Sequence, residues 1–208
     1  MEMKPILFNT GMVRAILDSH KTVTRRVVKP QPEGARSILD CDEEKRTFDL
    51  LCGNGGVGGV FVDWAETVKA PFWPHDILYV RETWTVWNGN YEYKADVDDG
   101  YGPFCSNCTL DICAGGCNSI LKWHPSIHMP REAARIFLRV TDVRVERVQD
   151  IDDDGVVAEG LNIGDPFDEL WDSTIKPADR ALYGWDANPW VWVIEFERIT
   201  REEVTPHA

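Results

Sequence analysis

The sequence KTVTRR, residues 21–26, places three cationic side chains and two hydroxyls within six positions. It follows a segment with the apolar spacing of an amphipathic helix, residues 11–19. Because β-branched and polar residues are interleaved, we interpret the stretch as a loop that runs into a strand, with alternate side chains on one face. Lys21 and Thr24 would then converge on a ligand, with one of the next two arginines beside them. The alternative is a solvated basic turn.

Charge is distributed unevenly along the 208 residues. The formal net charge is -13, yet residues 1–36 hold seven lysines and arginines against three acids. An acidic chain is poorly suited to coating nucleic acid nonspecifically, since that mode depends on summed attraction to phosphates. A basic patch on an acidic body indicates a local site for one nucleotide or a short strand. We expect a cytoplasmic protein, because no signal peptide or membrane-spanning segment is evident.

The remaining local patterns predict a mixed α+β domain in which strands dominate. Strands are expected at residues 5–8, 76–87, 135–145 and 190–198, and helices at 11–19, near 152–161 and near 167–171. Two polar, turn-rich segments interrupt this pattern and are interpreted as insertions, at about 30–60 and 88–123. We expect residues 1–208 to form a single domain, because no linker divides them.

Glu82 stands out within the predicted strand at residues 76–87. Alternation places it on the same face as Leu78, Val80 and Trp84. A carboxylate among apolar neighbours needs a partner, because an isolated buried charge is costly. Lys21 or an arginine of the basic stretch is a candidate partner, and an ordinary structural ion pair is the alternative.

Four of the six cysteines lie within 13 residues of the second insertion: Cys105, Cys108, Cys113 and Cys117. Their spacing is close to that of a zinc knuckle, and four thiolates can enclose a tetrahedral zinc. Such a zinc would be structural, because four protein ligands leave no open position for chemistry. An iron–sulfur centre and reduced thiols are the alternatives. Cys41 and Cys52 are expected to be free thiols.

The basic stretch, the segment Tyr79-Val80-Arg81-Glu82-Thr83-Trp84 and the closing aromatic strand together resemble the ASCH family. Residues 5–9, 124–131 and 188–193 are similar to ASCH-type proteins of bacteriophages and prophages. The resemblance covers most of residues 4–200 apart from the insertions. It implies a PUA-like mixed β-barrel with flanking helices, and binding related to RNA.

Some small ASCH proteins are amidohydrolases that remove the acyl group of N4-acetylcytidine, and the resemblance carries their reactive residues onto Lys21, Thr24 and Glu82. Amide hydrolysis requires a nucleophile, a base and a proton donor for the leaving amine. A desolvated Lys21 could activate the Thr24 hydroxyl, and Glu82 could pass a proton to the amine. Arg26 or backbone N–H groups could stabilise the oxyanion.

Ligand contacts are expected from a wider set of arginines, aromatic residues and a histidine. The set consists of Arg25, Arg26, Arg81, Trp84, His128 and Trp190. A tryptophan near a strand end can stack on a base, although most of the nine tryptophans are expected to serve packing. His124 and His128 are interpreted as hydrogen-bonded loop residues rather than as a zinc pair.

The sequence therefore supports recognition of RNA or a modified nucleoside, with or without hydrolysis of an N4-acylated cytidine. The expected partner is a nucleoside or single-stranded RNA, and the expected metal is a structural zinc. The alternative is a non-catalytic phage accessory protein that binds nucleic acid or protein partners. Salt dependence separates strand binding from hydrolysis of a neutral nucleoside, because only the former releases counterions.

Overall fold

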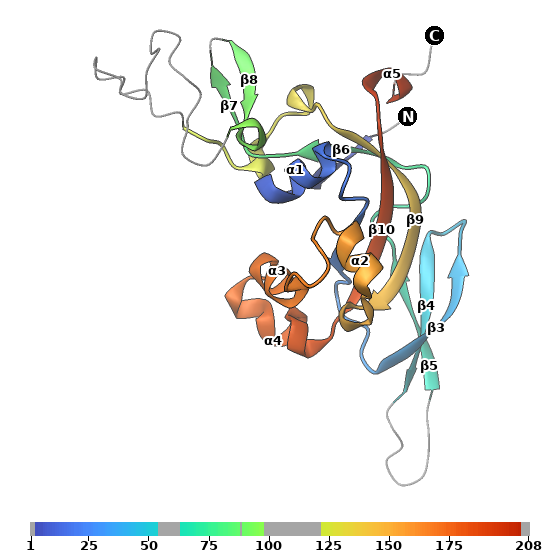
Figure 1. The fold of residues 1–208 in the computed structure, drawn as a ribbon. Coiled ribbons are helices and arrows are strands. Elements are labelled where there is room, and N and C mark those ends of the chain that lie inside the picture. The colour runs from blue at the N-terminus through green and yellow to red at the C-terminus, as the bar shows by residue number, and fades with distance from the viewer. Residues whose placement is uncertain (1–2, 54–62, 88, 98–121, 205–208) are drawn as a thin grey trace. The chain divides into compact units, whose positions relative to one another are not determined.

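The computed structural model describes residues 3–53, 63–87, 89–97 and 122–204 (Figure 1). They form two compact units, each assembled from segments that are distant in the sequence. Unit 1 comprises Met1–Ser19, Ile77–Leu138 and Arg198–Ala208, and unit 2 comprises His20–Asp76 and Arg139–Glu197. Each unit is described by itself below.

Unit 1 is built on a parallel strand pair and a hairpin. Strand β1 (Met3–Leu7) pairs in parallel with β6 (Ile77–Arg81), and β7 (Trp84–Trp87) pairs in antiparallel with β8 (Asn90–Tyr93). Helix α1 (Thr10–Leu17) follows β1 directly. The Asn9 side chain accepts a hydrogen bond from the backbone N–H of Met12 at 2.8 Å and so caps this helix.

The core of unit 1 gathers side chains from β6, β9 (Phe137–Arg147), β10 (Trp190–Ile199) and the segment before β9. That segment holds two short 3-10 helices, Ser126–His128 and Arg131–Ala133. A further 3-10 helix, Lys94–Asp96, follows β8, and the short helix α5 (Arg201–Val204) follows β10. The buried members of this core are Ile77, Met129, Ala133, Ala134, Phe137 and Ile199.

Unit 2 contains β2 (Val23–Val27), which pairs in antiparallel with β10. A separate three-stranded sheet has the order β3-β4-β5, with β3 at Ala35–Asp42, β4 at Thr47–Gly53 and β5 at Asp63–Lys69. The first insertion, interpreted from the sequence as a polar, turn-rich segment, therefore contributes two regular strands. Leu50 and Cys52 on β4 are fully buried, which explains why this sheet is regular.

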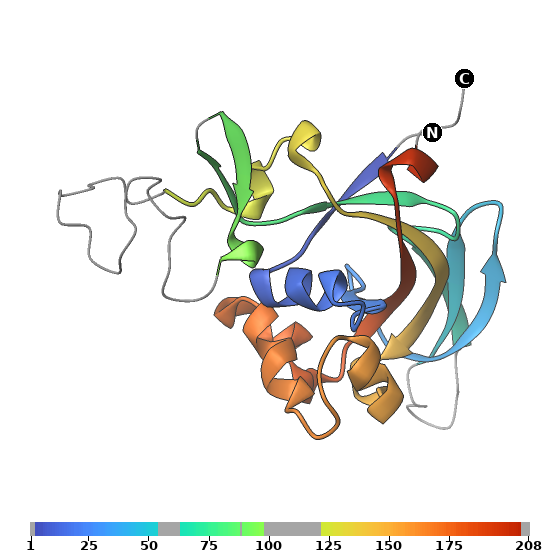
Figure 2. The same cartoon turned by 45° about the horizontal axis from the view of Figure 1, so that its top comes forward.

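Helices α2 (Asp153–Ala158), α3 (Phe167–Thr174) and α4 (Arg180–Tyr183) also belong to unit 2. Figure 2 shows them grouped together and apart from the sheet β3-β4-β5. Three 3-10 turns connect this part of the chain, at Val148–Asp150, Pro177–Asp179 and Trp185–Ala187. Their core consists of Val23, Val148, Phe167, Trp171, Val191 and Val193.

Strands β9 and β10 each pass from one unit into the other, and the sheet through which they run has the order β1-β6-β9-β10-β2. The mixed α+β class predicted from the sequence is confirmed. The strands in the described part of the chain do not close into a barrel. The PUA-like fold and the single domain therefore stay predictions.

One predicted strand is divided in the structure. The segment 76–87 forms β6 and β7, with Glu82 and Thr83 between them. The physical reason is a change of partner, because β6 pairs with β1 whereas β7 pairs with β8. None of the helices in the described ranges is long and apolar enough to cross a membrane.

Candidate functional site

Lys21 lies just before β2 and is only 2% exposed. Its Nζ donates to the backbone oxygen of Glu159 at 2.9 Å and to Glu159 Oε2 at 2.5 Å. The backbone holds the same two segments together, since Lys21 and Glu159 form an antiparallel bridge and the Thr22 N–H donates to the Ala158 carbonyl at 2.9 Å. The end of α2 is thus fastened to the start of β2.

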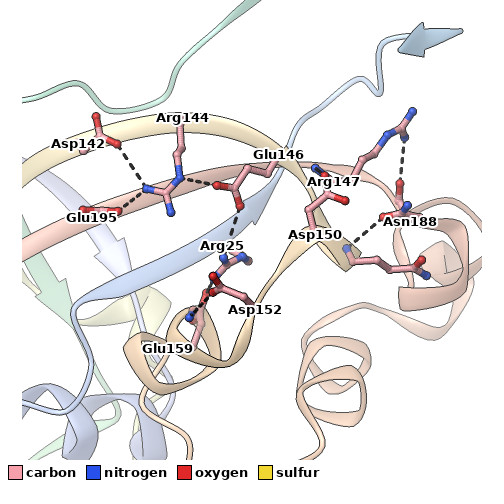
Figure 3. A network of polar contacts seen from close by, with 12 residues as sticks. Arg25, Asp142, Arg144, Glu146, Arg147, Asp150, Asp152, Glu159, Asn188 and Glu195 are labelled. Carbon is pink, nitrogen blue, oxygen red and sulfur yellow. Dashed lines mark hydrogen bonds and ion pairs between the residues drawn. The ribbon is translucent and has the colours of Figure 1, made fainter. Parts of the chain in front are cut away.

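Glu159 binds a second cation with its other carboxylate oxygen (Figure 3). Arg25 Nη1 donates to Glu159 Oε1 at 3.4 Å, and Arg25 Nη2 lies 3.5 Å from Glu146 Oε2. The Arg25 guanidinium also lies 5.9 Å from the centre of the Phe167 ring. Lys21, Glu159 and Arg25 therefore form one buried cluster, in which a single carboxylate contacts two cations.

Strand alternation on β2 separates the predicted site residues. Ile194 lies opposite Thr24, Val193 opposite Arg25 and Trp192 opposite Arg26 in the pairing with β10. Because successive side chains point to opposite faces, Arg25 faces away from Thr24, and Arg26 shares the face of Thr24. The sequence left open which arginine accompanies Thr24, and the register favours Arg26.

Burial perturbs the protonation of Lys21. Desolvation lowers its pKa from the ordinary value of 10.5, and the nearby positive charges of Arg26 and Arg25 act in the same direction. The charge and hydrogen bond of Glu159 oppose this shift. The net effect is a lysine that loses its proton more easily than an exposed lysine, which is the property of a general base.

Glu82, in unit 1, is 1% exposed and has an arginine partner. Arg135 Nε donates to Glu82 Oε1 at 2.9 Å and Arg135 Nη2 to Oε2 at 3.1 Å, which is a bidentate pair. Burial nevertheless raises the pKa of the Glu82 carboxyl, and Arg135 only partly offsets this effect. The ion-pair partner of Glu82 is therefore Arg135, whereas the sequence analysis named Lys21 or an arginine of the basic stretch as the candidate.

Arg135 is itself held by neighbours of its own unit. Its Nη1 donates to Asp96 at 2.7 Å, and its guanidinium lies 3.9 Å from the centre of the Tyr93 ring. Tyr93 in turn donates from its hydroxyl to the Ala133 carbonyl at 2.6 Å. These contacts fix the orientation of the guanidinium against Glu82.

The other predicted ligand residues differ in exposure and make structural contacts. Arg81 Nε donates to the Met129 carbonyl at 2.9 Å, and His128 is exposed at the end of a 3-10 helix. The Trp84 ring lies 5.0 Å from His124. Trp190 is buried beneath Arg147, whose guanidinium lies 4.3 Å from the ring centre, and this favours a packing role.

A pocket of about 290 Å³ opens in unit 2 beside Arg25. Five carboxylates and two guanidiniums line it, which gives the lining a formal charge of -3. Both guanidiniums are paired with carboxylates (Figure 3). Arg144 bonds Glu146 and Glu195, and Arg25 contacts Glu146 and Glu159. The lining consists of Val23, Arg25, Arg144, Glu146, Asp150, Asp152, Asp154, Gly155, Ala158 and Glu195.

The predicted zinc ligands, Cys105, Cys108, Cys113 and Cys117, lie outside the described residues. Within the described ranges, no group of three or more histidine, cysteine or acidic side chains is arranged to hold a metal. Cys41 and Cys52 are free thiols, as expected. The zinc site stays a prediction.

Sequence reasoning missed Glu159 and Arg135, the two residues that complete the buried ion pairs. Lys21 and Glu159 are 138 positions apart, and Glu82 and Arg135 are 53 apart. Neither residue belongs to a motif, and a lone acid after a short helix is normally solvated. The only available signal was the need of each buried charge for an opposite charge.

Comparison of the chain with protein-family models, with curated proteins and with solved structures finds no significant match. A function must therefore be inferred from the side chains themselves.

Proposed function

We propose that this chain is an ASCH-type protein that recognises a modified nucleoside and hydrolyses the amide of an N4-acylated cytidine. The observation that carries the proposal is Lys21, a buried lysine whose pKa is lowered chiefly by desolvation and which lies three residues before Thr24. A buried amine that releases its proton readily can activate a hydroxyl, which an exposed lysine does poorly at neutral pH.

In the proposed reaction, which takes the roles of Lys21 and Thr24 from the resemblance, Lys21 accepts the proton of the Thr24 hydroxyl as Thr24 Oγ1 attacks the amide carbonyl carbon. The bond between this carbon and the exocyclic nitrogen then breaks, and the nitrogen takes a proton to leave as the amino group of cytidine. Water subsequently hydrolyses the acyl ester on Thr24. The resemblance carries the proton donor onto Glu82, which lies in unit 1. Within unit 2, the proton that Lys21 has accepted is available to the leaving nitrogen.

The charges of unit 2 support a neutral nucleoside over a nucleic-acid strand. Arg25 was expected to contact a ligand, but it is 7% exposed and already binds two carboxylates. Acids make up half of the residues that line the pocket beside it, and their negative charge repels phosphate. A phosphodiester strand needs accessible cations, whereas a neutral base needs hydrogen-bond donors and acceptors.

The test is to incubate the purified protein with N4-acetylcytidine and other N4-acylcytidines and to follow the release of cytidine by chromatography. We expect turnover by the wild-type protein and a loss of at least about 100-fold in Lys21→Met, the usual scale of a general-base contribution. Lys45→Met is the matched control, because Lys45 is exposed and pairs only locally with Asp42. Turnover retained in Lys21→Met would exclude Lys21 as the base.

Absence of turnover across all substrates would favour the binding alternative, including a non-catalytic phage accessory protein. The next measurement would then be binding to short single-stranded RNA at increasing salt. A steep loss of affinity with salt would indicate phosphate contacts, and a flat response would indicate recognition of a base.

A structural zinc held by Cys105, Cys108, Cys113 and Cys117 is part of the same proposal. Elemental analysis of the purified protein should give about one zinc per chain, the stoichiometry of a site with four cysteine ligands. The double variant Cys105→Ser, Cys108→Ser should lose the zinc, and Cys41→Ser, which changes the exposed free thiol, should retain it. Equal zinc content in the wild-type protein and both variants would contradict this assignment.

A further inference from the structure

The geometry points to Glu159 as a positioning residue that acts through Lys21, whose amine it holds in place with two acceptors. The inference rests on the proposed function and adds to it a residue 138 positions from the basic stretch. Glu159 contacts both Lys21 and Arg25, and its role in the reaction is exerted through Lys21.

Glu159 holds the amine with two acceptors. It accepts from Lys21 Nζ with both its backbone oxygen and Oε2, at 2.9 and 2.5 Å. Two acceptors on one residue restrict the amine more than a single side-chain contact does. The backbone bridge between the same two residues keeps both acceptors in register with the lysine.

The carboxylate of Glu159 is itself anchored. Its Oε1 accepts from Arg25, which is held in turn by Glu146 and by the Phe167 ring. Glu159 is 5% exposed, so its side chain has little freedom to leave Lys21. Because Arg25 binds one carboxylate oxygen of Glu159, the other oxygen stays directed at the Lys21 amine.

Charges of both signs act on Lys21. Arg25 and Arg26, both on β2, favour the neutral amine, and Glu159, at the end of α2, favours the ammonium. Glu159 is thus the group that limits how far burial lowers the pKa. Without its charge, Lys21 should lose its proton at lower pH, because an opposite charge at this distance shifts a pKa by about 1–3 units.

The experiment follows the ¹³Cε chemical shift of Lys21 with pH in protein labelled with ¹³C-lysine, assigned by comparison with Lys21→Met. Glu159→Gln keeps the size of the side chain and the backbone acceptor, and we expect it to lower the titration midpoint by about 1–3 pH units. Glu146→Gln is the matched control. Glu146 contacts Arg25 as Glu159 does, but it is not among the leading causes of the lowered pKa of Lys21, so the midpoint should move much less than in Glu159→Gln.

The pH profile of cytidine release gives a second readout that a merely structural role would not change. Only the neutral amine can act as a base, so a lower midpoint moves the rising limb of kcat/KM to lower pH in Glu159→Gln. Glu159→Asp, which restores the charge on a shorter side chain, should move the limb back toward the wild-type position. Circular dichroism checks that each variant is folded.

An unchanged Lys21 midpoint in Glu159→Gln would overturn the inference. A lowered midpoint with an unchanged pH profile would also overturn it, because Glu159 would then not act on the reaction. If the wild-type protein shows no turnover but the midpoint falls, the proposed function fails while the control of Glu159 over the Lys21 proton stands. The two failures are therefore distinguishable.

Discussion

Among the residues that the structure describes, each unit contains one deeply buried carboxylate paired with a cationic side chain, but the two cations differ in kind. In unit 1, Glu82 is bound by Arg135 through two hydrogen bonds. In unit 2, Glu159 is bound by Lys21 and Arg25 together. A guanidinium remains charged at any accessible pH, whereas an amine can become neutral when it is desolvated. The comparison indicates that the cation of unit 1 has a fixed charge, whereas unit 2 contains one that can exchange a proton.

Solvent access adds to this difference. The Arg135 side chain is 27% exposed, whereas the Lys21 side chain is 0% exposed. Water reaches the cation in unit 1 and stabilises its charge, but it does not reach the amine in unit 2. The pair in unit 1 thus has the character of a structural ion pair, which the sequence left open as the alternative for Glu82.

The largest effect is expected from removing the carboxylate in unit 2. Glu159→Ala leaves two buried cations without their shared partner and should lower the free energy of unfolding by about 3–5 kcal/mol at pH 7. Urea denaturation measures this loss. Glu197→Ala is the control, because the side chains of the Glu197–Arg139 pair are 53% and 34% exposed and the pair should contribute less than about 1 kcal/mol. An equal loss of unfolding free energy in the two variants would mean that the cluster of Lys21, Glu159 and Arg25 is accessible to water.

A smaller effect is expected when the fixed charge of unit 1 is kept but its geometry is changed. Arg135→Lys removes the bidentate arrangement, and losing one hydrogen bond to the Glu82 carboxylate should cost about 1.5–3 kcal/mol. Arg139→Lys, at an exposed pair, is the matched substitution and should be nearly neutral. If Arg135→Lys were equally neutral, the two cations would be interchangeable and the comparison would lose its basis.

Helix α2 offers a third test, because it places Glu159 against Lys21. Asp152 Oδ1 accepts from the Gly155 N–H at 2.8 Å and caps this helix. Asp152→Ala should cost about 1 kcal/mol by removing the cap. Asp154→Ala, in the same first turn but without the cap bond, should cost less. Thermal unfolding of both variants measures the difference, and the reverse order would contradict the assignment of the cap.

The smallest effect concerns the proton on Glu82. Burial raises the pKa of this carboxyl above 4.5, so the folded protein retains the proton to higher pH than the unfolded chain. This contribution to stability is complete below pH 4.5 and is lost as the pH rises through the folded pKa. The stability of the wild-type protein relative to Glu82→Gln should therefore fall as the pH rises above 4.5. A relative stability that rises over this range would show that Arg135 outweighs burial.

Local patterns were sufficient for the elements with strong periodicity or a cap. The closing strand was expected at residues 190–198 and β10 is Trp190–Ile199, since a run of β-branched and aromatic residues has few other stable conformations. The helices expected at residues 11–19 and near 152–161 are present as α1 and α2, and each is capped by a side chain, Asn9 and Asp152, that replaces a missing helical hydrogen bond. The loop and strand at residues 21–26 were also predicted correctly.

Contacts between distant residues could not be obtained in this way. Nothing near Lys21 in the sequence indicates that its carboxylate comes from Glu159, because the choice depends on where α2 packs against β2. The division of residues 76–87 into two strands likewise depends on which strands lie beside them. Burial of Glu82 was inferred from alternation, but the identity of its partner required the structure.

The most direct test of the role assigned to Lys21 is its titration in the wild-type protein, followed through its ¹³Cε chemical shift. We predict a midpoint below 10.5, the ordinary value for a lysine, because desolvation outweighs the attraction of Glu159. A midpoint at or above 10.5 would mean that Lys21 remains an ordinary ammonium ion. It would then be a structural partner of Glu159 and not a base.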